Sequence, residues 1–483
     1  MTKLFPVLGA SLMIAACSST LDSVTADTLI TDVDIIDVQS GEVRPDQYVA
    51  IRGEEIIWVG DNAEHIQALK TLDGTDQYIM PGLWDMHVHF GGGEKLIAEN
   101  RDLLPLYLAY GVTTVRDAAA DISESVLQWR EQINNNTLVG PTLYTSGPKL
   151  EGKGSIWAGD LEVETEEEMN AALDQLQAMN VDFIKITDSA LTPELYLKAV
   201  KEVKKRGLPI SGHIPFALSV TDVSEAGLDG IEHMPYLLKA GASNEAEISA
   251  KVKSGELGYW SALPIIRANF DEQVALSKYR VLAENNTAVV PTLIGSQIIA
   301  HIDEDNHQND PELALLGSGL KATYSWRVER AEQKAAADPN EVTERKARFA
   351  ATRDLLPLLA HANVTIMAGT DTGYLNSYIY PGKALHDELA IYVQGGLTPL
   401  QALQSAVLTG PKWLGKSAQY GAVASGKKAD LLLLNSNPLE DINNTRDIAT
   451  VFSHGKAYNQ QRIQTLLEQA KAKVAAQEAE EKH

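Results

Sequence analysis

Two histidines separated by one residue, His87 and His89, end an apolar segment that begins at Ile79. Side chains alternate between the two faces of a β-strand, so a strand that ends in this way presents both imidazoles to one point in space. Neutral imidazole is the commonest protein ligand for zinc and similar ions. The spacing therefore predicts part of a metal site. The competing interpretation, two partly exposed histidines near a turn, has to be weighed against the rest of the chain.

Four more residues of metal-binding type follow or interrupt short apolar runs: Lys185, His213, His233 and Asp371. Taken singly, a histidine in such a place is usually structural, and a buried lysine is usually half of an ion pair. An aspartate after a strand can simply cap the next helix. Taken together with the His-x-His pair, and in this order, the four residues predict a shared metal site. That prediction requires elements that bring all of these segment ends to one place.

Residues 79–410 provide such elements, because apolar strand-like runs alternate there with helix-compatible sequence. This alternation is typical of βα units with a parallel sheet. Eight parallel strands close into a (β/α)8 TIM-type barrel of the α/β class, with its active site at the carboxyl ends of the strands. The predicted strands are Ile79–His89, Val112–Asp117, Thr142–Ser146, Asp182–Ile186, Pro209–His213, Gly230–His233, Ala288–Leu293 and Val364–Asp371.

Both ends of the chain show β-strand patterns instead. Residues 27–78 and 411–460 are rich in short apolar runs bounded by turns, and they predict one small β-sandwich domain into which the barrel is inserted. Between the seventh and eighth strands, residues 321–359 predict a helical excursion near the mouth of the barrel, with a break near Pro339. Residues 461–483 predict a charged helical tail.

The first residues indicate export. Lys3 and the apolar stretch that follows it have the form of a signal peptide over residues 1–16, too short to span a bilayer. The segment that ends in Cys17, the only cysteine of the chain, resembles the lipobox of bacterial lipoproteins. That resemblance implies a lipid anchor on Cys17, a tether over residues 17–26, and a place in the periplasm or cell envelope at the outer membrane. An ordinary secretory signal with an incidental cysteine is the alternative.

The charge of the chain limits its partners. The formal net charge is −24 at pH 7. Binding to a nucleic acid needs clustered lysine and arginine, so this balance argues against a nucleic-acid partner. A small-molecule substrate is the partner that the metal-site prediction implies, and a homo-oligomer remains open.

The whole ordered set of motifs resembles the amidohydrolase superfamily, in its imidazolonepropionase-like and Xaa-Pro dipeptidase-like branch. The resemblance covers nearly all of the chain after the leader. It rests on Pro81 to His89, Gly111 to Asp117, the strand around Lys185, His213, His233, Ala368 to Gly373, Leu385 to Leu389, Gly396 to Pro399 and Gly426 to Leu431.

This resemblance implies a site for two divalent metal ions, zinc first, with manganese, cobalt or iron as the other choices. A hydroxide between the ions would be the nucleophile. Asp371 would take its proton and pass it to the leaving amine, as general base and then acid. The implied ligands are His87, His89 and Asp371 for the more buried ion, His213 and His233 for the second, and Lys185, carboxylated to a carbamate, as the bridge.

The reaction implied is hydrolysis of an amide bond in a dipeptide or an N-acyl amino acid. One departure weakens a prolidase assignment, because dipeptidase-like relatives often carry Gly-His-Gly after the third strand and residues 147–155 contain no histidine. Lys153 and Tyr236 are candidates to contact a substrate carboxylate. Their simpler interpretations are a solvated loop lysine and a packed tyrosine.

Two other functions stay open at this point. The first is a mononuclear deaminase or a cyclic-amide hydrolase with one metal. Mononuclear deaminases need no lysine on the fourth strand, and the deaminases usually carry glutamate three residues after the fifth-strand histidine, where this chain has Phe216. A lipid-anchored metal-binding protein without activity is the third reading, although all six ligand positions are filled. His386 is interpreted as a structural histidine.

Overall fold

The computed structural model describes residues 23–480. The predicted signal peptide and the lipidation site Cys17 lie outside these residues. The first strand, β1, already begins at Val24. The last residues of the segment expected to be a tether, 24–26, are therefore part of a sheet.

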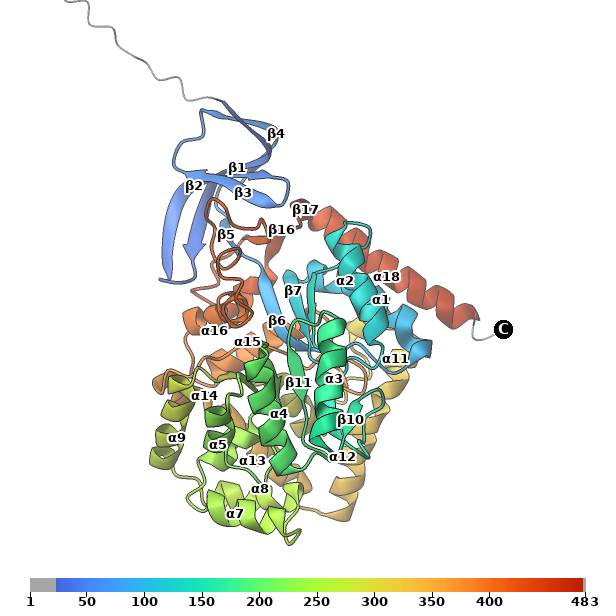
Figure 1. Cartoon of the computed structure of the whole chain (residues 1–483). Helices are drawn as coiled ribbons and strands as arrows, with labels where there is room; N and C mark the ends of the chain where they lie inside the picture. Colours follow the sequence, from blue (N-terminus) through green and yellow to red (C-terminus); the bar gives the residue numbers. More distant parts are fainter. Residues whose placement is uncertain (1–22, 481–483) are drawn as a thin grey trace, which may run out of the picture.

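One end of the molecule is a β domain built from both ends of the chain (Figure 1). Its eight strands form one connected sheet in the order β17-β16-β15-β5-β1-β2-β3, with β4 alongside β1. Aliphatic side chains from both chain ends, among them Ile35 and Leu431, share its core. The strands are β1 (Val24–Asp37), β2 (Glu42–Arg52), β3 (Glu55–Gly60), β4 (Ile66–Asp73), β5 (Tyr78–Pro81), β15 (Leu431–Leu434), β16 (Ile448–Ser453) and β17 (Lys456–Asn459).

The segment predicted as one strand, Ile79–His89, is two strands in different sheets. β5 belongs to the β domain and β6 (Leu83–Val88) begins the barrel. Gly82 lies between them, and a Cβ atom there would meet the Thr113 hydroxyl oxygen at 2.2 Å. The chain therefore passes from one domain to the other where only glycine fits, and both strands are buried apart from Tyr78.

The second domain is a closed barrel of parallel strands. Between β8 and β11 the ring is linked by the Asp182 amide, which donates to the Thr145 carbonyl at 2.9 Å. The eighth position is filled by residues 366–372, which form bridges from Ile366 to β14 and from Thr372 to β6. The α/β class and the (β/α)8 barrel with a β domain are thus confirmed. The other strands of the ring are β7 (Val112–Asp117), β8 (Thr142–Thr145), β11 (Ile184–Ile186), β12 (Ile210–Gly212), β13 (Gly230–Glu232) and β14 (Ala288–Val290).

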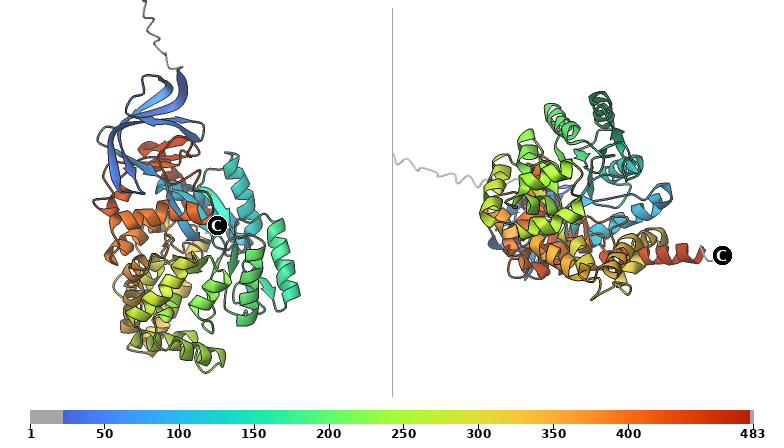
Figure 2. Two further views of the ribbon diagram at one scale, coloured as in Figure 1. Left: turned by 60° about the vertical axis from the view of Figure 1, so that its left-hand side comes forward. Right: turned by 90° about the horizontal axis from the view of Figure 1, so that it is seen from below.

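Helices surround the barrel strands (Figure 2). Some of them begin with a side-chain cap, as at Thr165, whose side chain and Glu168 form a capping box on α3 (Glu166–Ala178). The helices before the long insertion are α1 (Ile97–Ala109), α2 (Ser123–Asn134), α3 (Glu166–Ala178), α4 (Pro193–Lys205), α5 (Val220–Ala226), α6 (Pro235–Ala240), α7 (Glu245–Lys253), α8 (Tyr259–Ala268), α9 (Glu272–Glu284) and α10 (Leu293–Ala300). Those after it are α14 (Leu356–His361), α15 (Lys383–Gln394), α16 (Pro399–Val407) and α17 (Thr409–Trp413), and the 3-10 turns are η1 (Glu94–Leu96), η2 (Pro311–Leu315) and η3 (Ile442–Arg446).

Two insertions meet over the carboxyl ends of the barrel strands. The first follows β8 and contains β9 (Leu150–Gly152) and β10 (Leu161–Val163). The second contains α11 (Ser318–Thr323), α12 (Ser325–Ala337) and α13 (Glu341–Arg353), with the break between α12 and α13 that the sequence predicts. The insertions touch where Trp157 packs edge-on against Trp326, with ring centroids 6.2 Å apart.

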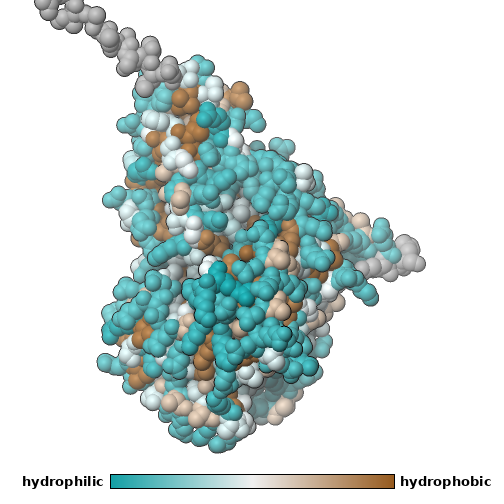
Figure 3. Space-filling model, in the orientation of Figure 1, coloured by the Kyte–Doolittle hydropathy of each residue, from teal (hydrophilic) through white to brown (hydrophobic). Residues whose placement is uncertain are grey.

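The chain ends in a long helix, α18 (Gln460–Glu480), as the tail pattern predicts. The helix lies along α1, to which Lys473 is linked by an ion pair of 2.6 Å with Asp102, and it projects from the side of the molecule (Figure 1). On the face drawn in Figure 3, hydrophilic residues predominate and apolar ones form small separate patches. Within residues 23–480, no helix combines the length and the apolar character needed to cross a bilayer.

His386 on α15 joins the barrel to the β domain. Its Nε2 donates to the Tyr110 carbonyl at 2.8 Å, and its Nδ1 is hydrogen-bonded with the Thr445 hydroxyl at 2.8 Å. Burial lowers the pKa of this imidazole from 6.5 to about 4. In the unfolded chain this imidazole therefore becomes protonated below about pH 6.5, whereas in the folded chain it stays neutral down to about pH 4. Acidification between these two pH values therefore destabilises the folded state.

We expect this one group to remove roughly 3 kcal/mol of stability between pH 6.5 and 4, at about 1.4 kcal/mol per pH unit. His386→Gln has no titratable group at this position. On acidification its free energy of unfolding should therefore fall less than that of the wild type, and the difference should equal this amount. Urea unfolding at pH 7 and pH 4 measures the difference. His361→Gln, at an exposed position, is the control and should follow the wild type. Equal acid sensitivity of wild type and His386→Gln would contradict the assignment.

Candidate metal centre

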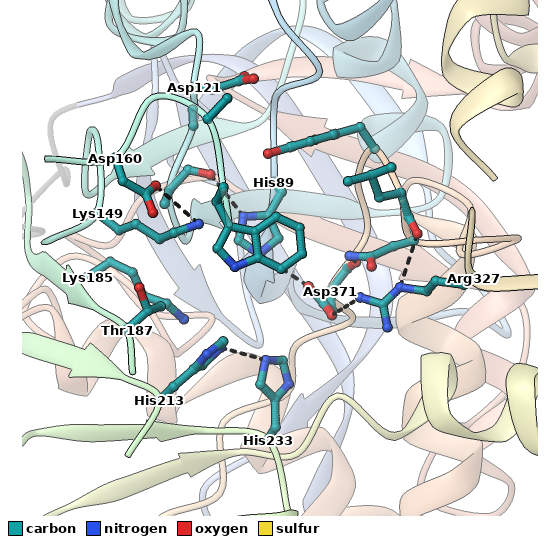
Figure 4. A pocket seen from close by; sticks show the side chains of 17 residues that line it. His89, Asp121, Lys149, Asp160, Lys185, Thr187, His213, His233, Arg327 and Asp371 are labelled. Carbon is teal, nitrogen blue, oxygen red and sulfur yellow. Dashed lines mark hydrogen bonds and ion pairs between the residues drawn. The ribbon is translucent and has the colours of Figure 1, made fainter. Parts of the chain in front are cut away.

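The segment ends singled out in the sequence converge at the carboxyl ends of the barrel strands (Figure 4). His87 and His89 lie at the end of β6, and Asp371 lies at the end of the eighth segment. Asp371 Oδ1 is 3.4 Å from His87 Nε2 and 3.2 Å from His89 Nε2, and the two Nε2 atoms are 3.1 Å apart. The three side chains can therefore hold one metal ion between them.

A second histidine pair faces the first from the neighbouring strands. His213 follows β12 and His233 follows β13, and their Nε2 atoms are 3.1 Å apart. The ring centroids of His233 and His87 are 5.1 Å apart. His233 has a left-handed backbone with φ of 69°, which is uncommon for a residue other than glycine. The two pairs are thus close enough to belong to one two-ion site.

The outer hydrogen bonds of the first pair fix which ring nitrogen is free. His87 Nδ1 donates to Glu232 Oε2 at 2.6 Å, and His89 Nδ1 donates to the Ala119 carbonyl at 2.9 Å. A carboxylate and a carbonyl can only accept, so the proton of each neutral ring sits on Nδ1. The lone pair of each ring is therefore on Nε2, the atom that faces the shared space, as metal-binding histidines require.

The second pair follows the same rule. His233 Nδ1 lies 2.6 Å from Thr292 Oγ1, whose own hydrogen is donated to the Pro291 carbonyl, so the histidine is the donor. His213 Nδ1 lies 3.4 Å from Asp188 Oδ1. Burial lowers the pKa of both imidazoles well below 6.5 and keeps them neutral. Two neutral rings whose Nε2 lone pairs face each other at hydrogen-bond distance are suited to a shared cation.

Lys185 on β11 adds to this group of side chains a buried amine that lacks a hydrogen-bond partner. Its side chain is 2% exposed, and its Nζ makes no hydrogen bond within the described residues. The nearest carboxylate oxygen is Glu232 Oε1, at 3.8 Å. Burial lowers the pKa of this amine to about 8, so a minor fraction is neutral near neutral pH. A neutral buried amine can react with carbon dioxide, and a carbamate would turn this unsatisfied donor into a pair of metal-binding oxygens.

Asp371 is the ionised member of the site. Burial acts to raise the pKa of its carboxyl, but the adjacent imidazoles of His87 and His89 outweigh burial and lower the pKa well below 3.8. The donor set is therefore four imidazole lone pairs, one carboxylate and one free amine. This set fits divalent metal ions, for which imidazole nitrogen and carboxylate oxygen are ordinary ligands.

A buried ion pair behind the site was not identified in the sequence. Glu232 Oε1 accepts from Arg116 Nη2 at 2.8 Å, while its other oxygen orients His87. Arg116 also donates to the Met86 carbonyl, and its guanidinium lies over the rings of Phe183 and Trp413. The sequence signal for this pair was a charged residue inside each of the strands β7 and β13, because buried charges are rarely left unpaired.

The pocket in front of the site encloses about 670 Å³, counted to its open mouth. Much of its wall comes from the two insertions. Lys149, Trp157 and Asp160 belong to the insertion after β8, and Arg327 belongs to α12. Lys149 Nζ lies 3.3 Å from Asp160 Oδ1. These residues were missed because loop sequence carries no periodic pattern that assigns a side chain to a pocket.

The two predicted substrate contacts do not line this pocket. The side chain of Lys153 is 66% exposed and pairs with Glu164 at 3.0 Å, so the lysine of the insertion that reaches the pocket is Lys149. Tyr236 is buried on α6, with its ring centroid 6.2 Å from that of His213. Its hydroxyl lies 3.5 Å from Asp188 Oδ2, the carboxylate whose other oxygen is 3.4 Å from His213 Nδ1.

The position that distinguishes mononuclear deaminases is apolar in three dimensions as well. Phe216 is 5% exposed and packs against Tyr236 and Tyr259, with ring centroids 5.6 Å and 4.5 Å away. Its side chain therefore offers no proton donor or acceptor near the centre.

Comparison with known proteins agrees with this geometry. The family described as "Amidohydrolase family" matches residues 78–458. A curated protein named ochratoxinase, from Aspergillus niger, is 25% identical over 461 residues, which cover 83% of this chain and 80% of that protein. Among solved structures, a bottromycin amidohydrolase superposes with a TM-score of 0.69 at 18% identity, covering 92% of this chain and 90% of that one. A Xaa-Pro dipeptidase with bound methionine superposes with a TM-score of 0.64 at 20% identity, covering 89% and 99%.

Proposed function

The chain belongs to the amidohydrolase family, a family of hydrolases that act on C–N bonds, and from this premise we propose that it hydrolyses the amide bond of a dipeptide or an N-acyl amino acid at a centre of two divalent ions. The observation that carries the proposal is the arrangement of four Nε2 lone pairs around Asp371 and the unsatisfied amine of Lys185. Zinc is the first choice of metal from the imidazole-rich donor set, with manganese, cobalt and iron as alternatives.

His87, His89 and Asp371 would hold one ion, His213 and His233 the other, and a carbamate on Lys185 would join them. Bound at this place, divalent ions supply Lewis acidity to the scissile carbonyl and favour deprotonation of the attacking water. Glu232 holds His87 in the tautomer and orientation that this role needs, through its 2.6 Å hydrogen bond.

Asp371 moves the proton. Its pKa lies well below the ordinary value, so the group is ionised and carries no proton of its own when the water attacks. A C–O bond forms, the C–N bond breaks, and Asp371 returns the proton to the leaving nitrogen, so that one amide and one water give an acid and an amine. The substrate pocket lies directly in front of this carboxylate.

The names of the aligned proteins support a small substrate with an amide bond, since they include a Xaa-Pro dipeptidase, a bottromycin amidohydrolase and an ochratoxinase. The missing histidine after the third strand speaks against a strict copy of the dipeptidase site. N-acyl amino acids are therefore included in the proposal on equal terms with dipeptides.

A library of dipeptides and N-acyl amino acids tests the proposal. We expect protein reconstituted with zinc or manganese and bicarbonate to release amino acids from a subset of these compounds, and chelated protein to release none. Release of ammonia from nucleobases without any amide cleavage would favour the deaminase alternative. Full metal loading without any turnover would favour a binding protein.

We also propose that the chain is a lipoprotein of the bacterial envelope, anchored through Cys17 and facing the periplasm. The support is the lipobox-like sequence around this single cysteine. Labelling cells with a fatty-acid probe should mark the wild type and not Cys17→Ala, and only the wild type should sediment with outer membranes. A wild-type protein that is unlabelled and found in the soluble periplasmic fraction would contradict the anchor.

A further inference from the structure

The long helical insertion places one cation beside the proton-transferring carboxylate. Arg327, on α12, lines the pocket and points its guanidinium toward Asp371 (Figure 4). The distance from Arg327 Nη2 to Asp371 Oδ2 is 4.0 Å. The two histidines contact the other oxygen, Oδ1. Arg327 therefore stands on the substrate side of Asp371, opposite to the metal ligands.

Most of the hydrogen-bonding capacity of Arg327 is unused. A guanidinium carries five N–H groups. Its Nε donates to the Leu375 carbonyl at 3.1 Å, and its terminal nitrogens make no hydrogen bond within the described residues. The distance of 4.0 Å to Asp371 exceeds hydrogen-bond length. The planar fork formed by the two terminal nitrogens, which suits a carboxylate, is therefore open to the pocket.

The other carboxylates of the pocket are already engaged. Asp160 pairs with Lys149 and accepts from the Ser155 hydroxyl. Asp121 accepts from the backbone amides of Gly92 and Gly93, at 3.0 to 3.2 Å. Among the described residues that line the pocket, Asp371 is the only acid near Arg327, and its Oδ1 is directed at the histidines. An anion that accepts hydrogen bonds from the free N–H groups of Arg327 therefore has to come from outside the chain.

We propose that Arg327 binds the free carboxylate of the substrate, so that the enzyme selects amides whose leaving group is an amino acid with an unblocked α-carboxylate. This inference rests on the proposed function and deepens it. In such a substrate the carboxylate carbon and the leaving nitrogen are bonded to the same Cα, so covalent geometry keeps the nitrogen roughly 3 Å from a carboxylate oxygen.

This short distance between the leaving nitrogen and the carboxylate explains why Arg327 lies next to Asp371. A carboxylate held on the open fork sets the leaving nitrogen next to Asp371, the group that has to protonate it. Binding of the acid end and delivery of the proton are thus coupled by two side chains 4.0 Å apart. A substrate without the carboxylate would leave the fork unsatisfied in a partly desolvated place, which disfavours its binding.

The test compares Arg327→Gln with the wild type on a matched pair of substrates, an N-acyl amino acid and its C-terminal primary amide. We expect kcat/KM for the acid to fall about 10- to 100-fold, mainly through KM, as is usual for loss of hydrogen bonds to a charged group. The kcat/KM for the amide should stay within about threefold of the wild-type value, so the preference for the acid over the amide is lost. Arg327→Lys should recover part of it, since lysine keeps the charge and loses the fork.

Arg330→Gln is the matched control, because Arg330 lies one turn further along α12, over the rings of Trp260 and Trp326 and outside the pocket lining. It should keep the wild-type selectivity. An equal loss on acid and amide in Arg327→Gln, or no loss on either, would overturn the carboxylate site.

A binding measurement separates this inference from the proposed function. Calorimetry should show that the N-acyl amino acid binds to the wild type more tightly than its primary amide, and that Arg327→Gln removes the difference. If the wild type cleaves no compound of the dipeptide and N-acyl amino acid library, the hydrolase proposal fails while the binding comparison still decides the role of Arg327. Equal binding of acid and amide by the wild type would refute it.

Discussion

The Asp371→Asn protein is expected to keep most of its bound metal and to lose turnover by about 10²- to 10⁴-fold, the usual contribution of a positioned acid–base group. Asparagine retains an oxygen at the ligand position but cannot take up the proton that hydrolysis has to move. The backbone should not change, because Asp371 has φ of 62° and asparagine tolerates this left-handed region better than most residues.

The measurement is kcat together with metal content by elemental analysis on the same sample. Asp387→Asn is a suitable control, since this aspartate pairs with Lys383 and Arg446 near the surface, away from the pocket. It should retain wild-type turnover. Hydrolysis by Asp371→Asn at the wild-type rate would rule out the proton-transfer role, whereas loss of metal and activity together would assign Asp371 to metal binding alone.

Replacing Lys185 by alanine should lower turnover by a similar factor, because the protein should bind less metal. Without the amine no carbamate can form, and the two ions lose their common ligand. We expect at least about 100-fold lower turnover, the upper end of the loss seen when an outer partner of a metal ligand is removed. The bound metal should fall below that of the wild type.

The cavity left by Lys185→Ala gives a sharper version of this test. Acetate or propionate can enter the space of the missing side chain and offer the same two oxygens, so either should restore part of the metal content and turnover. Lys185→Met fills that space without an amine and should not be rescued. Normal activity of Lys185→Met would show that the lysine serves only to fill the barrel interior.

The candidate metal centre could be predicted from the sequence because the residues that form it follow strands. His87 and His89 share a face by the alternation of a single strand, and parallel strands that close into a barrel bring His213, His233 and Asp371 to the same end. Lys185 was recognisable because a cation between two isoleucines in a three-residue strand is costly without a role.

The residues on the substrate side of the pocket could not be predicted from the sequence, for a physical reason. Lys149 and Arg327 come from two insertions that meet where Trp157 packs against Trp326. No periodicity specifies that contact, and the neighbouring Lys153, which resembled Lys149 in sequence terms, points to solvent and pairs with Glu164.

The domain junction was misplaced for a related reason. The run from Ile79 to His89 is apolar throughout, so its pattern does not reveal a change of sheet. Gly82 marks the change, since its missing side chain permits the close approach of Thr113. The buried pair of Arg116 and Glu232 was also overlooked, although it orients His87 and so belongs to the support of the site.

The most direct test of the central claim is the number of divalent ions bound per chain. Mature protein loaded with zinc in the presence of bicarbonate, and freed of excess metal, should contain about two ions per chain and should lose both metal and amide hydrolysis on chelation. A protein that binds no divalent ion under these conditions, and that hydrolyses no amide after zinc or manganese is supplied with bicarbonate, would contradict the account.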